Sequence, residues 1–217
     1  METVEIARRF RGPSSSGNGG YTCGLLSRLV EGDAEVTLRA PPPLETPLRV
    51  DGLQVFDGET LVAEVRATTV ELELPEPVSF ADARALEQPP DPDHPFPECF
   101  VCGPQGDGLR LRPGPVGDGR VVAAWVPDQV SHELVWAALD CPGAFAVNPA
   151  FSRGPTVLGR LAAHVAEVPS VRDELVVVAW DLGGSDGRRL HAGTALFRGD
   201  RALAWARAVW FPVPSGP

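Results

Sequence analysis

The sequence predicts an α+β fold in which an antiparallel sheet wraps around a central helix, and it predicts this unit twice along the chain. Three observations support the prediction. Each half of the 217-residue chain holds one stretch with helical spacing of apolar residues, followed by strand-like runs. Two turn-linked strand pairs, one in each half, align with one another. A proline-rich segment separates the halves.

The first predicted unit covers residues 1–86. Gly19-Gly20 leads into a helix predicted over Tyr21–Val30. Alternating apolar residues then predict strands, with Asp57-Gly58 as a hairpin turn between the last two. These strands are predicted over Ala34–Arg39, Leu48–Phe56 and Thr60–Leu72.

The predicted linker is Glu87–Pro97, which holds five prolines in eleven residues. Neither a helix nor a central strand tolerates that density of proline. Each flanking half is small for an independent core, so we expect the two halves to complete one core together.

The second predicted unit covers residues 98–217. A helix is predicted over Glu133–Val147. The final strand pair, Ala195–Phe211, aligns with Leu53–Val70: both have an alternating strand, a short turn with glycine and an acid, and a second alternating strand. The alignment indicates a duplicated unit. The strands of this half are predicted over Leu109–Arg112, Arg120–Val126, Val157–Val165, Glu174–Asp181, Arg188–Phe197 and Arg201–Phe211.

The net charge and the hydropathy of the chain exclude several classes of binding partner. The net charge is −10, which argues against nucleic acid and anionic membrane surfaces as partners. All 19 basic residues are arginine, so Schiff-base chemistry on lysine is excluded. No apolar run is long enough for a transmembrane helix, and Met1–Phe10 lacks the apolar region of a signal peptide. We therefore expect a cytoplasmic protein.

The four cysteines include one Cys99-Phe-Val-Cys102 pair. Cys23 and Cys141 are each isolated in sequence, whereas a structural zinc site needs four ligands at matched spacing. His94 precedes Cys99 by five positions and leaves a Cys2His arrangement open. We expect two reduced thiols at a turn, with no bound metal and no disulfide.

Segments of both halves resemble acyl-CoA thioesterases of the hot-dog superfamily. His94-Pro95, followed by Cys99–Gly103 and then Gly108–Leu111, resembles the opening segment of thioesterases of the phenylacetate-pathway and 4-hydroxybenzoyl-CoA types. Leu134–Asp140 resembles the helix that carries their catalytic acid, and Asn18–Tyr21 resembles the Gly-Gly that begins the same helix. The resemblance implies a double hot-dog: two antiparallel sheets, each wrapping a central helix, joined into one continuous sheet.

The resemblance also implies an asymmetric pair of composite sites. The amides of Gly20 and Tyr21 would polarise the thioester carbonyl, because a helix start carries unpaired N–H groups and partial positive charge. Asp140 would activate water or attack directly. In the other composite site, Ser27 stands where an acid would be needed and His132 stands where glycine would be. We therefore expect one working site and one degenerate site.

Further candidates for substrate contact are Asn18, Gly19, Trp136, His132 and His191. Each has an ordinary structural alternative. Asn18 is a good helix cap, and Gly19 fits a flexible loop. His132 fits a helix start on the surface, and His191 fits a structural position on a strand. Trp136 lies one helical turn before Asp140, where it would line the acyl pocket; its alternative is a position in the core.

Asp140 has its own alternative role. It lies in an otherwise apolar stretch, where an acid is costly unless it is bonded or functional. The alternative is that it caps a short helix beginning near Pro142.

The sequence thus predicts hydrolysis of an acyl-CoA or acyl-carrier thioester, with no cofactor apart from the CoA of the substrate. The first alternative is a non-catalytic module that binds acyl-CoA or another hydrophobic ligand. The second is an enoyl-CoA hydratase, which fits less well because Phe145 stands where the hydratase pattern places histidine. The expected partner is a small-molecule acyl thioester, and the expected state is a monomer of two fused halves, with a homodimer as the alternative.

Overall fold

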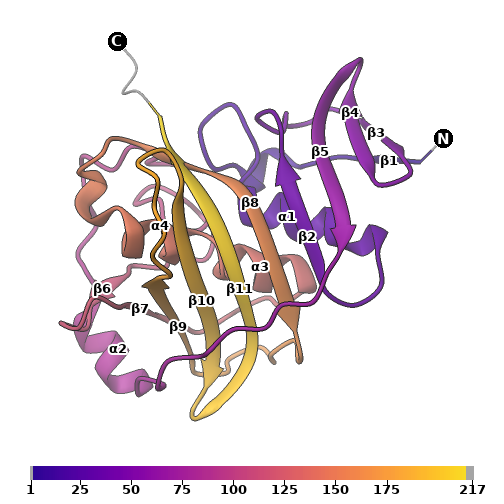
Figure 1. Cartoon of the computed structure of the whole chain (residues 1–217). Coiled ribbons are helices and arrows are strands. Elements are labelled where there is room, and N and C mark those ends of the chain that lie inside the picture. Colours follow the sequence, from indigo (N-terminus) through magenta and orange to yellow (C-terminus); the bar gives the residue numbers. More distant parts are fainter. Residues whose placement is uncertain (1, 214–217) are drawn as a thin grey trace.

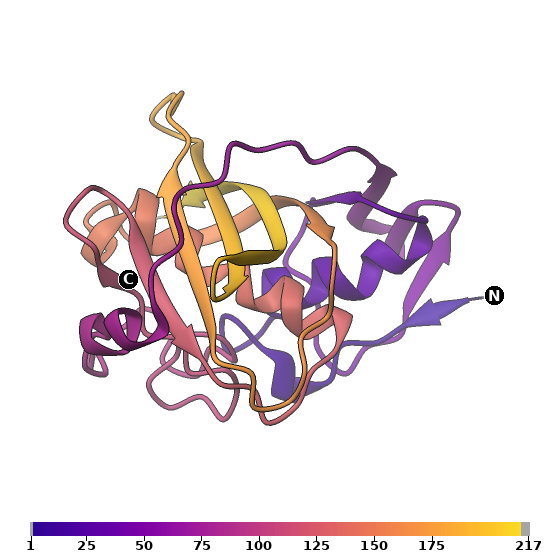
Figure 2. The same cartoon turned by 90° about the horizontal axis from the view of Figure 1, so that it is seen from below.

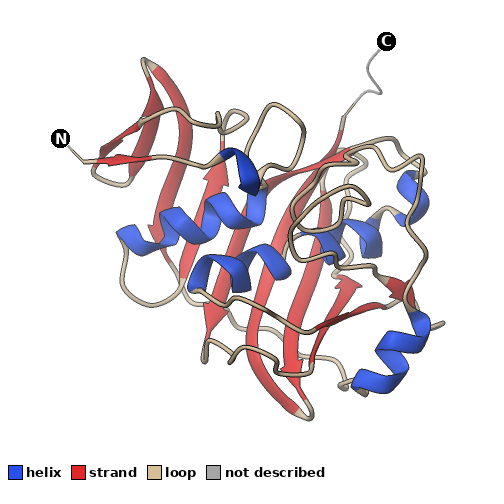
Figure 3. Ribbon diagram, turned by 180° about the vertical axis from the view of Figure 1, so that it is seen from behind, coloured by secondary structure: helices blue, strands red, loops and turns tan. Residues whose placement is uncertain are grey.

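A computed structural model describes residues 2–213. Its strands form one antiparallel sheet of eleven strands, in the order β1-β3-β4-β5-β2-β8-β11-β10-β9-β7-β6 (Figure 1). The central helices cover one face of this sheet, so the molecule has two layers (Figure 3). The strands of both halves therefore belong to a single sheet, as expected for joined hot-dog units. No helix among residues 2–213 has the length and apolar character needed to cross a membrane.

The first half contributes α1 (Gly19–Leu26) and five strands. The strand predicted over Leu48–Phe56 is in fact a hairpin, because Gly52 turns the backbone at φ +61°. Short 3-10 helices precede and follow α1, at η1 (Arg8–Phe10) and η2 (Ser27–Leu29). The strands are β1 (Thr3–Val4), β2 (Ala34–Leu38), β3 (Leu48–Asp51), β4 (Gln54–Asp57) and β5 (Thr60–Ala67).

The second half repeats this topology. After the helix, β5 returns beside β2 in the first half, and β11 returns beside β8 in the second. The aligned hairpins β4–β5 and β10–β11 occupy equivalent places in the sheet. The strands are β6 (Gly114–Pro115), β7 (Val121–Trp125), β8 (Thr156–Val165), β9 (Leu175–Asp181), β10 (Leu190–Arg198) and β11 (Arg201–Pro212). The segment 109–112, predicted as a strand, is irregular, and Arg110 has φ +54°.

The predicted helix Glu133–Val147 is broken into α3 (His132–Ala138) and α4 (Cys141–Val147). The break lies at Asp140, whose φ and ψ are both −84°. Pro142 explains it, because proline has no N–H to donate and restricts the residue before it. A short 3-10 helix, η3 (Pro149–Phe151), follows α4.

The two halves meet within the sheet and between the central helices. In the sheet, β2 pairs with β8, with Ala34 opposite Ala163. On the concave face, α1 and α3 lie side by side (Figure 2). Glycine permits the close approach of these helices: a Cβ on Gly20 would lie 2.7 Å from the carbonyl oxygen of Trp136, and one on Gly24 would lie 2.7 Å from Trp136 Cβ.

The segment after β5 connects the strands of the first half to those of the second. After β5 the chain crosses the sheet to α2 (Phe80–Leu86), which packs on β7 (Figure 1). Trp205 Nε1 holds this crossing segment by donating to the carbonyl oxygen of Val70, at 2.7 Å. The segment 87–97, predicted as the linker, follows α2. The Cys99–Cys102 turn comes directly after it and lies beside the ends of the central helices.

Candidate active site

A cavity of about 290 Å³ lies where α1 begins and where α3 breaks into α4. Its volume is at the lower end of the range for small-molecule sites. The ends of β2, β8 and β11 and the 94–102 segment close its other sides. Most of its wall is apolar, and the large apolar side chains are Leu38, Phe96, Phe145, Phe151, Leu158, Trp210 and Phe211.

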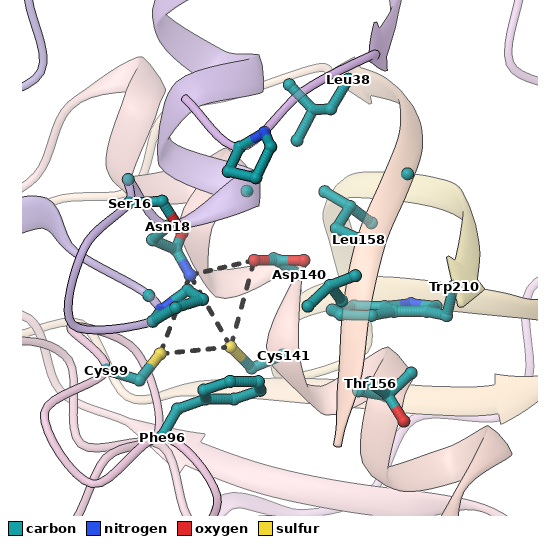
Figure 4. A pocket seen from close by; sticks show the side chains of 18 of the residues that line it. Ser16, Asn18, Leu38, Phe96, Cys99, Asp140, Cys141, Thr156, Leu158 and Trp210 are labelled. Carbon is teal, nitrogen blue, oxygen red and sulfur yellow. Dashed lines mark hydrogen bonds between the residues drawn. The ribbon is translucent and has the colours of Figure 1, made fainter. Parts of the chain in front are cut away.

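Asp140 is the buried acid of this cavity, with 1% of its surface exposed. Its Oδ2 accepts hydrogen bonds from Gly20 N–H at 2.9 Å and from Asn18 Nδ2 at 3.0 Å. Its Oδ1 has no hydrogen-bond partner among residues 2–213, and Figure 4 shows it on the side of Leu158 and Trp210. Burial raises the pKa of Asp140 to about 7, although the two donors oppose the shift. Its side chain makes no cap to α4, so the capping alternative does not apply.

Asn18 joins the start of α1 to this acid. Its Oδ1 accepts from Tyr21 N–H at 2.9 Å, which makes Asn18 the cap of α1, and its Nδ2 donates to Asp140. The side chain is 2% exposed. Asn18 is therefore both the expected cap and a part of the cavity wall.

The N–H groups at the start of α1 are arranged differently from expectation. Those of Gly20 and Tyr21 are already bonded, to Asp140 and Asn18. Gly19 lines the cavity, and its N–H makes no hydrogen bond within the described part of the chain. Among these three residues, Gly19 is thus the one whose N–H has no partner within residues 2–213. The ring of Tyr21 stacks on Phe10 with centroids 3.7 Å apart and faces a second, more polar cavity.

Three other candidates lie away from the cavity. Trp136 is buried between α1 and α3, where it packs on Gly24, and does not line the wall. His132 is the first residue of α3, at the end of the helix away from Asp140, and its Nε2 lies 2.8 Å from Ser27 Oγ. His191 is on β10, outside the cavity wall.

The Ser27–His132 contact marks the degenerate counterpart of the Gly20–Asp140 contact. Helices α1 and α3 run antiparallel, so the start of each helix meets the end of the other. At one junction a carboxylate meets an N–H; at the other a hydroxyl meets an imidazole. The acid nearby, Glu133, is paired with Arg28.

Two polar groups in the wall were not assigned to the site from sequence. Trp210 Nε1 and His94 Nε2 are buried, line the cavity and have no hydrogen-bond partner among residues 2–213. His94 Nδ1 accepts from Phe96 N–H at 3.0 Å, which leaves the ring proton on Nε2. Trp210 lies in an alternating strand and gives no sequence signal beyond that of a core residue.

Three thiols also reach the cavity, from Cys99, Cys102 and Cys141. Their Sγ atoms all lie within 4.8 Å of one another, and those of Cys99 and Cys141 are 3.8 Å apart (Figure 4). Cys141, isolated in sequence, therefore joins the CxxC pair in space.

No protein-family model matches the sequence, and no curated protein matches it. Solved structures do match nearly the whole chain. A protein of unknown function with a hot-dog fold from Alicyclobacillus acidocaldarius is 13% identical, with TM-score 0.65, covering 98% of this chain and 93% of its own. The tesB protein of Mycobacterium avium subspecies paratuberculosis is 14% identical, with TM-score 0.62, covering 98% and 92%.

A candidate thioesterase from Novosphingobium aromaticivorans is 11% identical, with TM-score 0.66, covering 98% of this chain and 95% of its own. At such identities the similarity shows the fold, and the chain has a hot-dog fold over nearly its full length.

Proposed function

We propose that the protein hydrolyses an acyl thioester whose acyl group lies in the cavity beside Asp140. One observation carries the proposal: the Oδ1 of Asp140 is buried, has no partner among the described residues and borders an apolar cavity. A carboxyl group in such a position costs stability, and buried acids of this kind gather at catalytic sites. The name of one structural neighbour, the candidate thioesterase from Novosphingobium aromaticivorans, supports the reaction class.

The contacts of Asp140 orient it for this task. Gly20 N–H and Asn18 Nδ2 hold Oδ2, so the carboxyl plane is fixed and Oδ1 is left for a water molecule. In the proposed step Oδ1 takes a proton as the water oxygen bonds to the thioester carbonyl carbon. The C–S bond then breaks, and the leaving thiol receives that proton.

The start of α1 supplies the complementary charge. The carbonyl oxygen gains negative charge as water adds, and the free N–H of Gly19 would donate to it. The helix start adds partial positive charge at the same point. The apolar side chains of the wall would take the acyl group.

The second candidate function is binding without turnover. It is favoured by the fact that the N–H groups of Gly20 and Tyr21 are both engaged within the protein. Such a module would hold an acyl thioester in the same cavity and release no thiol.

The test is release of free CoA from a panel of short, medium, long and aryl acyl-CoA substrates, with Asp140→Asn as the variant. We expect turnover to fall by about 10²–10⁴-fold, the usual effect of removing a general base. Asparagine keeps an oxygen that accepts from Gly20 N–H, so stability should change little. Ser27→Ala is the matched control at the degenerate junction and should keep wild-type turnover.

Unchanged turnover in Asp140→Asn would overturn the catalytic role of Asp140. A wild-type protein that binds acyl-CoA tightly and hydrolyses no member of the panel would establish the binding module instead.

A further inference from the structure

We propose that Cys99, Cys102 and Cys141 together hold one zinc ion in the wall of the cavity, with the fourth coordination position facing the cavity. This site goes beyond the proposed hydrolysis and stands on separate observations. It revises the expectation, drawn from sequence alone, that the CxxC pair is metal-free.

The spacing of the sulfur atoms fits a tetrahedral ion. With Zn–S bonds of about 2.3 Å, two ligands of one tetrahedron lie about 3.8 Å apart. The Sγ atoms of Cys99 and Cys141 are 3.8 Å apart, and all three sulfurs lie within 4.8 Å of one another. Small rotations of the side chains would close the set around one ion.

The CxxC turn brings the Sγ atoms of Cys99 and Cys102 within 4.8 Å of one another. The turn needs Gly103, because a Cβ there would lie 2.5 Å from the carbonyl oxygen of Pro97 and 2.8 Å from that of Cys99.

Asn18 supplies a further donor to two of the sulfurs. Its Nδ2 lies 3.9 Å from Cys99 Sγ and 3.8 Å from Cys141 Sγ. Hydrogen bonds of this kind orient metal-binding ligands and support their charge. The same Nδ2 donates to Asp140, so the thiols and the acid share one positioning residue.

An independent observation points to a ligand at the fourth position. His94 is 6% exposed, lines the same cavity and has an Nε2 without a partner among residues 2–213. Because Nδ1 accepts from Phe96 N–H, Nε2 carries the proton and acts as a donor. In the proposed site His94 would donate from Nε2 to a water or anion held in this cavity, and three thiolates take the place of the Cys2His arrangement left open by the sequence.

The choice of metal follows from the donors. Three thiolates form a soft ligand set that selects zinc over the hard cations calcium and magnesium. Once deprotonated, the three sulfurs would add negative charge beside Asp140, whose Oδ2 lies 4.0 Å from Cys141 Sγ, and a bound divalent cation would offset that charge. Binding would displace the thiol protons.

The experiment measures metal directly. The full chain is purified under reducing conditions, stripped with a chelator, and titrated with Zn²⁺ and separately with Co²⁺. We expect one ion per chain and a thiolate-to-cobalt charge-transfer band in the near ultraviolet. Cys99→Ser and Cys141→Ser should lose tight binding. Cys23→Ala is the matched control: Cys23 is also buried but lies on α1, outside the cluster, and the variant should bind like the wild type.

If a cysteine variant does not fold, protection of the wild-type cysteines from alkylation tests the same proposal. Zn²⁺ should shield Cys99, Cys102 and Cys141 of the wild-type chain together, as mapped by mass spectrometry. The proposal is overturned if the stripped wild type binds no ion, or if Cys141→Ser binds as tightly as wild type.

The outcome is separable from that of the proposed hydrolysis, because the metal assay uses no substrate. Asp140→Asn should still bind Zn²⁺ while it loses turnover.

Discussion

The N–H of Gly20 donates a 2.9 Å hydrogen bond to Oδ2 of Asp140, a residue 120 positions away in the other half of the chain. The contact exists because α1 and α3 approach each other closely enough for the backbone of one helix to reach a side chain at the end of the other. It fixes the acid, and it makes the site depend on the packing of both halves.

Gly20→Ala tests that dependence. The added Cβ would lie 2.7 Å from the carbonyl oxygen of Trp136, so α1 and α3 must move apart. We expect a loss of about 1–3 kcal/mol in the free energy of unfolding, measured with denaturant, and a loss of turnover. Gly24→Ala meets a similar clash farther from Asp140 and should lose stability with a smaller loss of turnover per folded chain. Wild-type stability in both variants would show that the helices do not need this approach.

Asn18→Asp separates the two duties of Asn18. Aspartate still accepts from Tyr21 N–H, but it cannot donate to Asp140 and adds a second carboxylate beside it. Losing a hydrogen bond to a charged group predicts a loss of about 1.5–3 kcal/mol in stability. Asn18→Ser is the comparison variant, because serine also caps a helix but adds no charge. We expect Asn18→Ser to lose less free energy of unfolding than Asn18→Asp in the same denaturant series. The difference between the two losses measures the repulsion between the two acids.

His132 predicts a pH dependence of stability. Burial lowers the pKa of His132 below 6.5, and Arg28 adds to this while Glu133 opposes it. At His132 the unfolded chain then binds more protons than the folded chain below about pH 6.5, so the contribution of His132 to stability falls as pH decreases through that window and is constant above it. The raised pKa of Asp140 acts in the opposite direction and is common to the wild type and the variant, so the difference between the two proteins reports His132. His132→Asn can still bond Ser27 and should flatten this decrease. Thermal melts of both proteins from about pH 7.5 to about pH 5 give the difference; parallel curves would contradict the assignment.

Ala144→Leu tests the acyl cavity. Ala144 is on α4, is 4% exposed and lines the wall. A larger side chain takes up part of the space, so we expect longer acyl-CoA substrates to lose more of their kcat/KM than the shortest one. The shortest substrate is the internal control for damage to Asp140. An equal loss across the panel would place the acyl group elsewhere.

Local patterns predicted much of the fold. Alternating residues located β2, β7 and the last four strands to within a few residues, and the hairpin alignment predicted the duplicated topology. Errors arose where one residue changed the backbone: Gly52 splits a predicted strand, and Pro142 breaks a predicted helix. The packing of α2 on β7, at the connection between the halves, has no local signature in the sequence.

The site was only partly predictable. Asn18, Gly19 and Asp140 line the cavity as proposed, because a helix start and an acid in an apolar stretch are visible in sequence. Which N–H stays free depends on the contacts made after the halves pack, and the N–H groups of Gly20 and Tyr21, predicted to polarise the carbonyl, are bonded to Asp140 and Asn18. Cys141 could not be joined to Cys99 from spacing, since 42 positions separate them and only the fold closes the distance.

The two halves, joined through β2 and β8, belong to one chain. This determines how the site behaves when the protein is diluted. A site assembled from two separate subunits falls apart when the protein is diluted below its dissociation constant. Here the two contributors are tethered, and their local concentration, in the millimolar range for a short connection, does not depend on how much protein is present. Specific activity should therefore stay constant on dilution, and each molecule carries a complete site even when few copies of it are made.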